Sequence, residues 1–128
     1  MRSLTVLFLL TFSLNASAGL FSNNNEDVQK AMKSYVENMI KNSSFMPVVY
    51  KGKVLKLNVA KSKKYPDGFH SGVKNKGDLF VSCADFIDQK GNKYDIDFLV
   101  NRSDDKYAVV QPIVHSINGE KNPYDLSH

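Results

Sequence analysis

Three aspartates are spaced so that they can share one face of a β-sheet. Asp85 lies in the apolar stretch 79–88, and Asp95 and Asp97 alternate with apolar residues in the stretch 94–101. Residues two apart in a strand point to the same side. Carboxylates opposed across strands repel, so one of them has a raised pKa or binds a cation. Such a group can supply a general acid and base, or a site for a hard cation.

His115, with Gln111, is expected on the same side of the sheet, from the last long alternating stretch. The candidate catalytic residues are therefore Asp85, Asp95, Asp97 and His115. The favoured alternative is a solvated sheet face, on which alternating aspartates are ordinary. No metal or catalytic spacing motif sharpens the catalytic interpretation.

A second candidate site lies in the long connection 61–77, which shows no alternation of its own and also carries Lys74 and Lys76. Connections longer than about 12–15 residues are often functional. Its candidate ligand-binding residues are Lys61, Lys63, Lys64, Tyr65, Phe69 and His70. Lysines beside aromatic rings can hold an anionic partner, such as a phosphorylated glycan, a lipid head group or an acidic protein patch. The favoured alternative is an extended, lysine-capped hairpin whose charge keeps a sheet edge soluble.

The cysteine and histidine pattern predicts no metal site and no cofactor. Cys83 is the only cysteine, so it can form neither an intramolecular disulfide nor an all-cysteine metal cluster. It lies in an apolar run and is expected to be buried. His70, His115 and His128 are scattered, without the paired spacing that marks zinc. A lone cysteine with scattered histidines is only a general indication of thiol chemistry.

Residues 1–18 have the pattern of a cleavable secretory signal. Arg2 precedes an uncharged apolar stretch, 4–14, and small residues follow at 15–18. The apolar stretch is too short to span a bilayer, which disfavours a membrane anchor. Gly19 occupies the place where a lipid-anchored product would need a cysteine. We therefore expect export to a periplasm or the extracellular space, without a lipid anchor.

The remaining residues, 19–128, are enough for a single domain with one core. Removal of the signal takes away one arginine and no acidic residue, so the formal net charge of +4 falls to +3. This excess is too small to indicate nucleic-acid binding. No further stretch is apolar enough to predict a transmembrane segment. The candidate partners are an anionic ligand or a protein, and the sequence does not indicate an oligomeric state.

The chain predicts one helix followed by strands. A helical stripe with acidic residues at its start consists of Val28, Ala31, Met32, Tyr35, Val36, Met39 and Ile40. Later apolar residues alternate, which predicts strands at 46–50, 53–60, 79–88, 94–101 and 107–117. Pro112 cannot donate to a ladder, so the last strand is expected at an edge or bulged there. Asn118 and Gly119 then predict a hairpin turn.

The turn 88–91 fixes the register between the strands 79–88 and 94–101. Asp at its first position and Gly at its last suit a type I turn that connects a hairpin. One face then has Phe86 opposite Tyr94, Ala84 opposite Ile96, Ser82 opposite Phe98 and Phe80 opposite Val100. The other face has Asp85 opposite Asp95 and Cys83 opposite Asp97. The first face is expected beneath the helix stripe.

We therefore expect an α+β fold in which an N-terminal helix packs on an antiparallel sheet of four or five strands. This order of elements resembles the cystatin-like and nuclear-transport-factor-like superfamily, in which a curved sheet wraps around a helix. The Gln-x-Val-x-Gly loop of true cystatins is absent, so the resemblance does not imply protease inhibition, and folds of this type serve many functions.

The leading functional hypothesis is a small, exported, non-enzymatic binding module. It would hold a protein or small ligand on its open sheet face or on the connection 61–77. One alternative is an inhibitor or immunity-type protein that blocks another enzyme. A second is a small hydrolase or isomerase that uses the aspartates and His115 in a pocket between helix and sheet.

Overall fold

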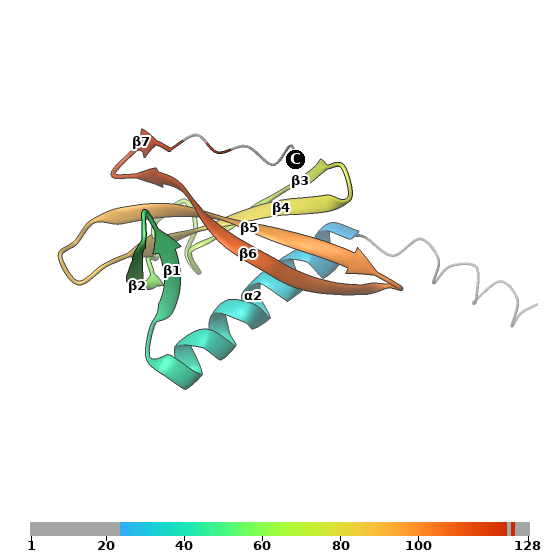
Figure 1. Cartoon of the computed structure of the whole chain (residues 1–128), viewed down its shortest axis with the longest axis horizontal. Helices are drawn as coiled ribbons and strands as arrows, with labels where there is room; N and C mark the ends of the chain where they lie inside the picture. The colour runs from blue at the N-terminus through green and yellow to red at the C-terminus, as the bar shows by residue number, and fades with distance from the viewer. Residues whose placement is uncertain (1–23, 123, 125–128) are drawn as a thin grey trace, which may run out of the picture.

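The computed structural model describes residues 24–122 and 124, so the predicted signal at 1–18 and His128 lie outside the described residues. Among the described residues, one helix is followed by seven strands (Figure 1). The helix is α2 (Asn24–Ser43), and the strands are β1 (Met46–Tyr50), β2 (Lys53–Val59), β3 (Phe69–Lys76), β4 (Leu79–Ile87), β5 (Lys93–Ser103), β6 (Lys106–Ile117) and β7 (Glu120–Lys121). Within these residues no helix has the length and apolar character needed to cross a membrane.

Helix α2 forms where the apolar stripe predicts it. Its fully buried residues, Val28, Met32 and Val36, belong to that stripe. Acidic residues occupy the first turn and Lys41 the last, as the helix dipole favours. The Tyr35 ring meets Phe98 of the sheet edge-on, with 6.1 Å between ring centroids. The stripe therefore faces the core.

The sheet is antiparallel, with the order β1-β2-β4-β5-β6-β7, and β3 also pairs with β4. The α+β class is confirmed, but seven strands replace the expected four or five. The connection 61–77 is not a loop throughout, because β3 occupies its second half. Most of β3 is exposed, so folding does not require apolar alternation there. The short β7 follows the turn at Asn118 and Gly119, which both have positive φ.

The predicted register between β4 and β5 is confirmed at every pair. Ala84, Phe86, Ile96 and Phe98 are fully buried, in one core cluster with Met32 of α2. The sheet face that carries them is therefore the face that the helix covers (Figure 1). Phe80, which was expected beneath the helix as well, is only partly buried, and its ring lies 6.0 Å from that of Tyr107.

Strand β6 is irregular around Pro112. Its pairing with β5 shifts register between Leu99 and Val100 and again between Asp95 and Ile96, which leaves Val110 and His115 as bulge residues. Within the described residues β7 pairs with β6 only at Ser116 and Ile117, beyond Pro112. The prediction of an edge or bulge at Pro112 is therefore confirmed.

The turn between β4 and β5 is organised by the Asp88 carboxylate. It accepts hydrogen bonds from the backbone of Lys90 and Asn92 and from the Asn92 amide and the Tyr94 hydroxyl, each at 2.9 Å. The Asn92 side chain is the main cause that lowers the pKa of Asp88, to about 2. This lowered pKa stabilises the fold above about pH 4, the range of an unfolded aspartate, and the stabilisation is lost as the pH falls toward 2.

We therefore expect Asp88→Asn to be less stable than the wild type at pH 6 and to lose less of its stability between pH 4 and 2. Urea denaturation at each pH measures both effects. Asp104→Asn, which removes an exposed carboxylate from another turn, is the matched control and should follow the wild type. Parallel pH curves for wild type and Asp88→Asn would contradict the assignment.

Candidate metal centre

The sheet face turned away from α2, here called the outer face, carries most of the polar residues singled out by the sequence. Cys83 and Asp85 come from β4, and their partners Asp97 and Asp95 come from β5. Asp97 is only 5% exposed, and Cys83 and Asp95 are half-buried. This part of the outer face is therefore covered rather than freely solvated.

His70 lies on the outer face because it follows Phe69, which packs against the core opposite Ala84. Phe69 pairs with Ala84 and Val73 with Ser82, so the register of β3 against β4 shifts between Phe69 and Val73. The preceding turn ends at Gly68, whose φ is +85° and whose backbone carbonyl accepts from the Asp85 amide at 2.8 Å. A Cβ at Gly68 would lie 2.4 Å from a Val59 methyl, so only glycine fits this close approach.

The His70 ring is held by three neighbours. Its Nε2 lies 2.8 Å from Asp85 Oδ1, and its Nδ1 lies 3.2 Å from Cys83 Sγ. The Tyr65 ring stacks on it with 4.1 Å between centroids. A carboxylate accepts hydrogen bonds, so the neutral tautomer that donates from Nε2 to Asp85 presents its Nδ1 lone pair to the sulfur. In that tautomer the ring directs an electron pair toward Cys83.

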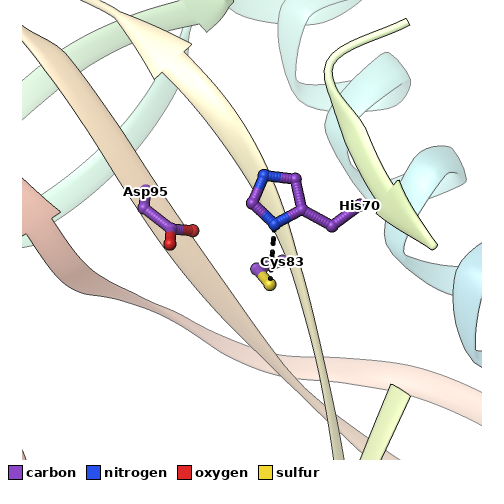
Figure 2. Close-up of side chains that lie close together, drawn as sticks. All are labelled: His70, Cys83 and Asp95. Atoms are coloured by element: carbon purple, nitrogen blue, oxygen red, sulfur yellow. Dashed lines mark hydrogen bonds between the residues drawn. The ribbon is translucent and has the colours of Figure 1, made fainter. Parts of the chain in front are cut away.

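Asp95 adds a third ligand atom beside this pair. Its Oδ1 is buried and has no hydrogen-bond partner among the described residues. Burial is the main cause that raises the pKa of Asp95, and the charges of Asp97 and Asp85 raise it further. Ligand atoms of His70, Cys83 and Asp95 all lie within 4.8 Å of one another. Figure 2 shows these side chains, the three-residue cluster, converging from adjacent strands.

The surroundings of the Cys83 thiol disfavour its ionisation. Burial is the main cause that raises its pKa, to about 12, and the charges of Asp95 and Asp97 contribute. Reactive cysteines lie in electropositive surroundings that lower their pKa. The surroundings of Cys83 have the opposite sign, which disfavours a free thiolate and favours a bound cation.

The three-residue cluster fits a zinc-type ion. Such ions take cysteine sulfur, histidine nitrogen and carboxylate oxygen at about 2.0–2.3 Å, so tetrahedral ligands lie roughly 3.3–3.8 Å apart. The cluster approaches this spacing before any ion is present. Metal-bound histidines usually donate their second ring N–H to a carboxylate, and Asp85 occupies that position for His70.

The remaining catalytic candidates form a separate group. His115 Nδ1 lies 3.0 Å from Asp97 Oδ2, and the Tyr124 hydroxyl donates to the same carboxylate. Asp97 is thus fully paired, unlike Asp95. The four candidate catalytic residues therefore do not converge on one point, because Asp97 and His115 pair with each other while Asp85 and Asp95 join His70 and Cys83.

The ligand-binding candidates of the connection 61–77 also divide. His70 belongs to the three-residue cluster and Tyr65 stacks on its ring, whereas Phe69 packs against the core beneath the Lys33 ammonium, 5.6 Å from its ring centroid. Lys64 lies over the Tyr65 ring at 5.3 Å, and Lys61 and Lys63 are exposed.

Sequence reasoning placed Cys83 beside the aspartates but did not predict its contact with His70. Cys83 and Asp85 are two residues apart in one strand, which placed both on the same face. The position of His70 depends on how β3 pairs with β4, which no sequence pattern indicated. No family model, curated protein or solved structure matches the chain, so its site is defined by geometry alone.

Proposed function

We propose that this chain is an exported binding module that holds a divalent transition-metal ion of the zinc type. The ligands are His70 Nδ1, Cys83 Sγ and the Asp95 carboxylate, and Asp85 orients His70. The observation that carries the proposal is the convergence of nitrogen, sulfur and oxygen ligand atoms within 4.8 Å. A cystatin-like architecture, with a curved sheet around one helix, agrees with the element order and is part of the proposal.

The unpaired Asp95 oxygen supports a cation at this place. A buried carboxylate oxygen without a partner is costly, and a metal ion would satisfy it. The ligand types select the ion, because Ca²⁺ and Mg²⁺ prefer oxygen ligands only, whereas zinc-type ions accept sulfur and imidazole. In this proposal, a site for a borderline-soft ion such as zinc replaces the hard-cation site that the aspartates alone suggested.

Cobalt titration of the metal-free protein tests the proposal, since Co²⁺ adopts zinc sites and reports its ligands by absorption. We expect one equivalent to bind, with intense visible bands of a tetrahedral ion and a near-ultraviolet band from sulfur-to-cobalt charge transfer. Zinc should bleach these bands and Ca²⁺ should not. Binding without the sulfur band, or no binding, would contradict the proposal.

One observation favours a second function, thiol catalysis. Cys83, His70 and Asp85 form a continuous chain through both ring nitrogens, with distances of 3.2 and 2.8 Å, as in cysteine-dependent acyl transfer. The raised pKa of Cys83 opposes this function. Alkylation of metal-free protein by iodoacetamide at pH 7 separates the two hypotheses. The metal proposal expects slower reaction than in the urea-unfolded chain, and faster reaction would favour catalysis.

Export rests on the pattern of residues 1–18. We expect amino-terminal sequencing of protein from the periplasmic or secreted fraction of the native source to begin at or near Gly19. Protein recovered from that fraction with Met1 intact would contradict cleavage. A cytosolic extract offers the control, because any uncleaved precursor should be found there.

A further inference from the structure

A cavity of about 340 Å³ opens on the outer face beside the three-residue cluster. Asp85 and Asp95 form part of its wall, and two lysines and two serines contribute polar groups. These four residues are Lys61, Ser62, Lys93 and Ser116. The volume falls within the range of small-molecule sites.

The cluster and the cavity share Asp95. The protein supplies three ligand atoms, whereas a tetrahedral ion takes four, and zinc sites with three protein ligands leave the fourth position to water or an exogenous ligand. Asp95 belongs both to the cluster and to the cavity wall, whereas His70 and Cys83 do not line the cavity. Asp95 is therefore the link through which a molecule in the cavity would approach the fourth position.

The charges around the cavity depend on the metal. Without an ion, Asp85 and Asp95 repel an anion from the cavity wall. A bound dication offsets the charges of the two carboxylates and offers an open coordination position to an anion. Lys61 and Lys93 are exposed, and within residues 24–122 their ammonium groups take part in no ion pair. They are thus free to bind the distal end of an anion.

We propose that the metal-loaded protein binds a small oxyanion, a carboxylate or phosphate, in this cavity. One ligand oxygen completes the coordination of the ion. The remaining anionic oxygens contact Lys61 and Lys93 and accept from the hydroxyls of Ser62 and Ser116. This inference rests on the proposed metal site, and it names the ligand class that a binding module of this kind would carry.

The test uses the full mature chain loaded with cobalt, with succinate and inorganic phosphate as two separate probes. We expect at least one probe to shift the visible cobalt bands and to bind by calorimetry, and the comparison shows which oxyanion the cavity prefers. The metal-free protein should bind the same probe at least about tenfold more weakly, because the two aspartates are then uncompensated.

The lysines supply matched variants. Lys93→Ala and Lys61→Ala should each weaken probe binding about fivefold or more, with cobalt affinity unchanged. The controls Lys63→Ala and Lys90→Ala remove neighbouring exposed charges that do not line the cavity, and both should bind the probe as the wild type does.

Three outcomes would overturn the inference. If cobalt binds with its sulfur band and neither probe shifts the visible bands, the cavity does not supply the fourth ligand, while the metal site stands. If a probe binds equally well without metal, or if Lys63→Ala matters as much as Lys61→Ala, binding is by surface charge alone. If cobalt itself does not bind, the proposed function fails first and the inference falls with it.

Discussion

Replacement of Cys83 by alanine is expected to weaken zinc binding by at least about 100-fold. The loss should exceed the 10–100-fold effect of removing an outer carboxylate, because a direct ligand is lost. Asp85→Asn, which removes only the partner of His70, should fall within that smaller range. Competition against a chromophoric chelator measures the zinc affinity of the wild type and of both variants. Asp78→Asn, a change on the β3–β4 turn, is the matched control and should bind as the wild type does.

Asp95→Asn separates a metal ligand from a structural residue. The substitution removes a carboxylate whose buried Oδ1 has no partner within the described residues, so the metal-free variant should be at least as stable as the wild type. Its zinc affinity should nevertheless fall as steeply as that of Cys83→Ala. Urea denaturation with and without zinc measures both effects. Lower stability of the metal-free variant, with zinc affinity unchanged, would show that Asp95 serves the fold instead.

Truncation of Phe98 to alanine is expected to cost about 3–5 kcal/mol of unfolding free energy. Phe98 is fully buried, and its ring lies 6.1 Å from that of Tyr35 and 6.0 Å from that of Phe86, so it joins the helix to the sheet. Urea denaturation of the metal-free protein measures the cost without a contribution from bound ions.

Phe80→Ala is the matched control, because Phe80 lies on the same face of β4 as Ala84, four residues away, but is only partly buried. It should lose clearly less stability than Phe98→Ala. A loss below about 1 kcal/mol for Phe98→Ala would contradict the assignment of the face that contains Ala84 and Phe98 to the core.

The helix and the central hairpin were predictable because local rules determine them. The stripe from Val28 to Ile40 must face a core, and the turn at Asp88 fixes which residue of β5 opposes each residue of β4. The placement of Asp85 opposite Asp95 therefore followed from one turn and one alternation. The face with Ala84 and Phe98 was expected beneath the helix, and its burial confirms that choice.

The candidate site was only partly predictable, because its third strand follows no local pattern. Phe69 and Val73 both pair with β4, but the register shift between them has no signal in the sequence. His70 was thus assigned to the long connection 61–77 and not to a strand beside Cys83. The bulge at His115, which pairs that residue with Asp97, is likewise a tertiary feature of β6.

The most direct test of the metal site is X-ray absorption at the zinc edge of the zinc-loaded mature chain. The site predicts one sulfur at about 2.3 Å, with the remaining ligands nitrogen or oxygen at about 2.0–2.2 Å. The sulfur contribution should vanish in Cys83→Ala. A spectrum with nitrogen and oxygen ligands only, in protein that carries one zinc per chain, would contradict coordination by Cys83 and with it the proposed centre.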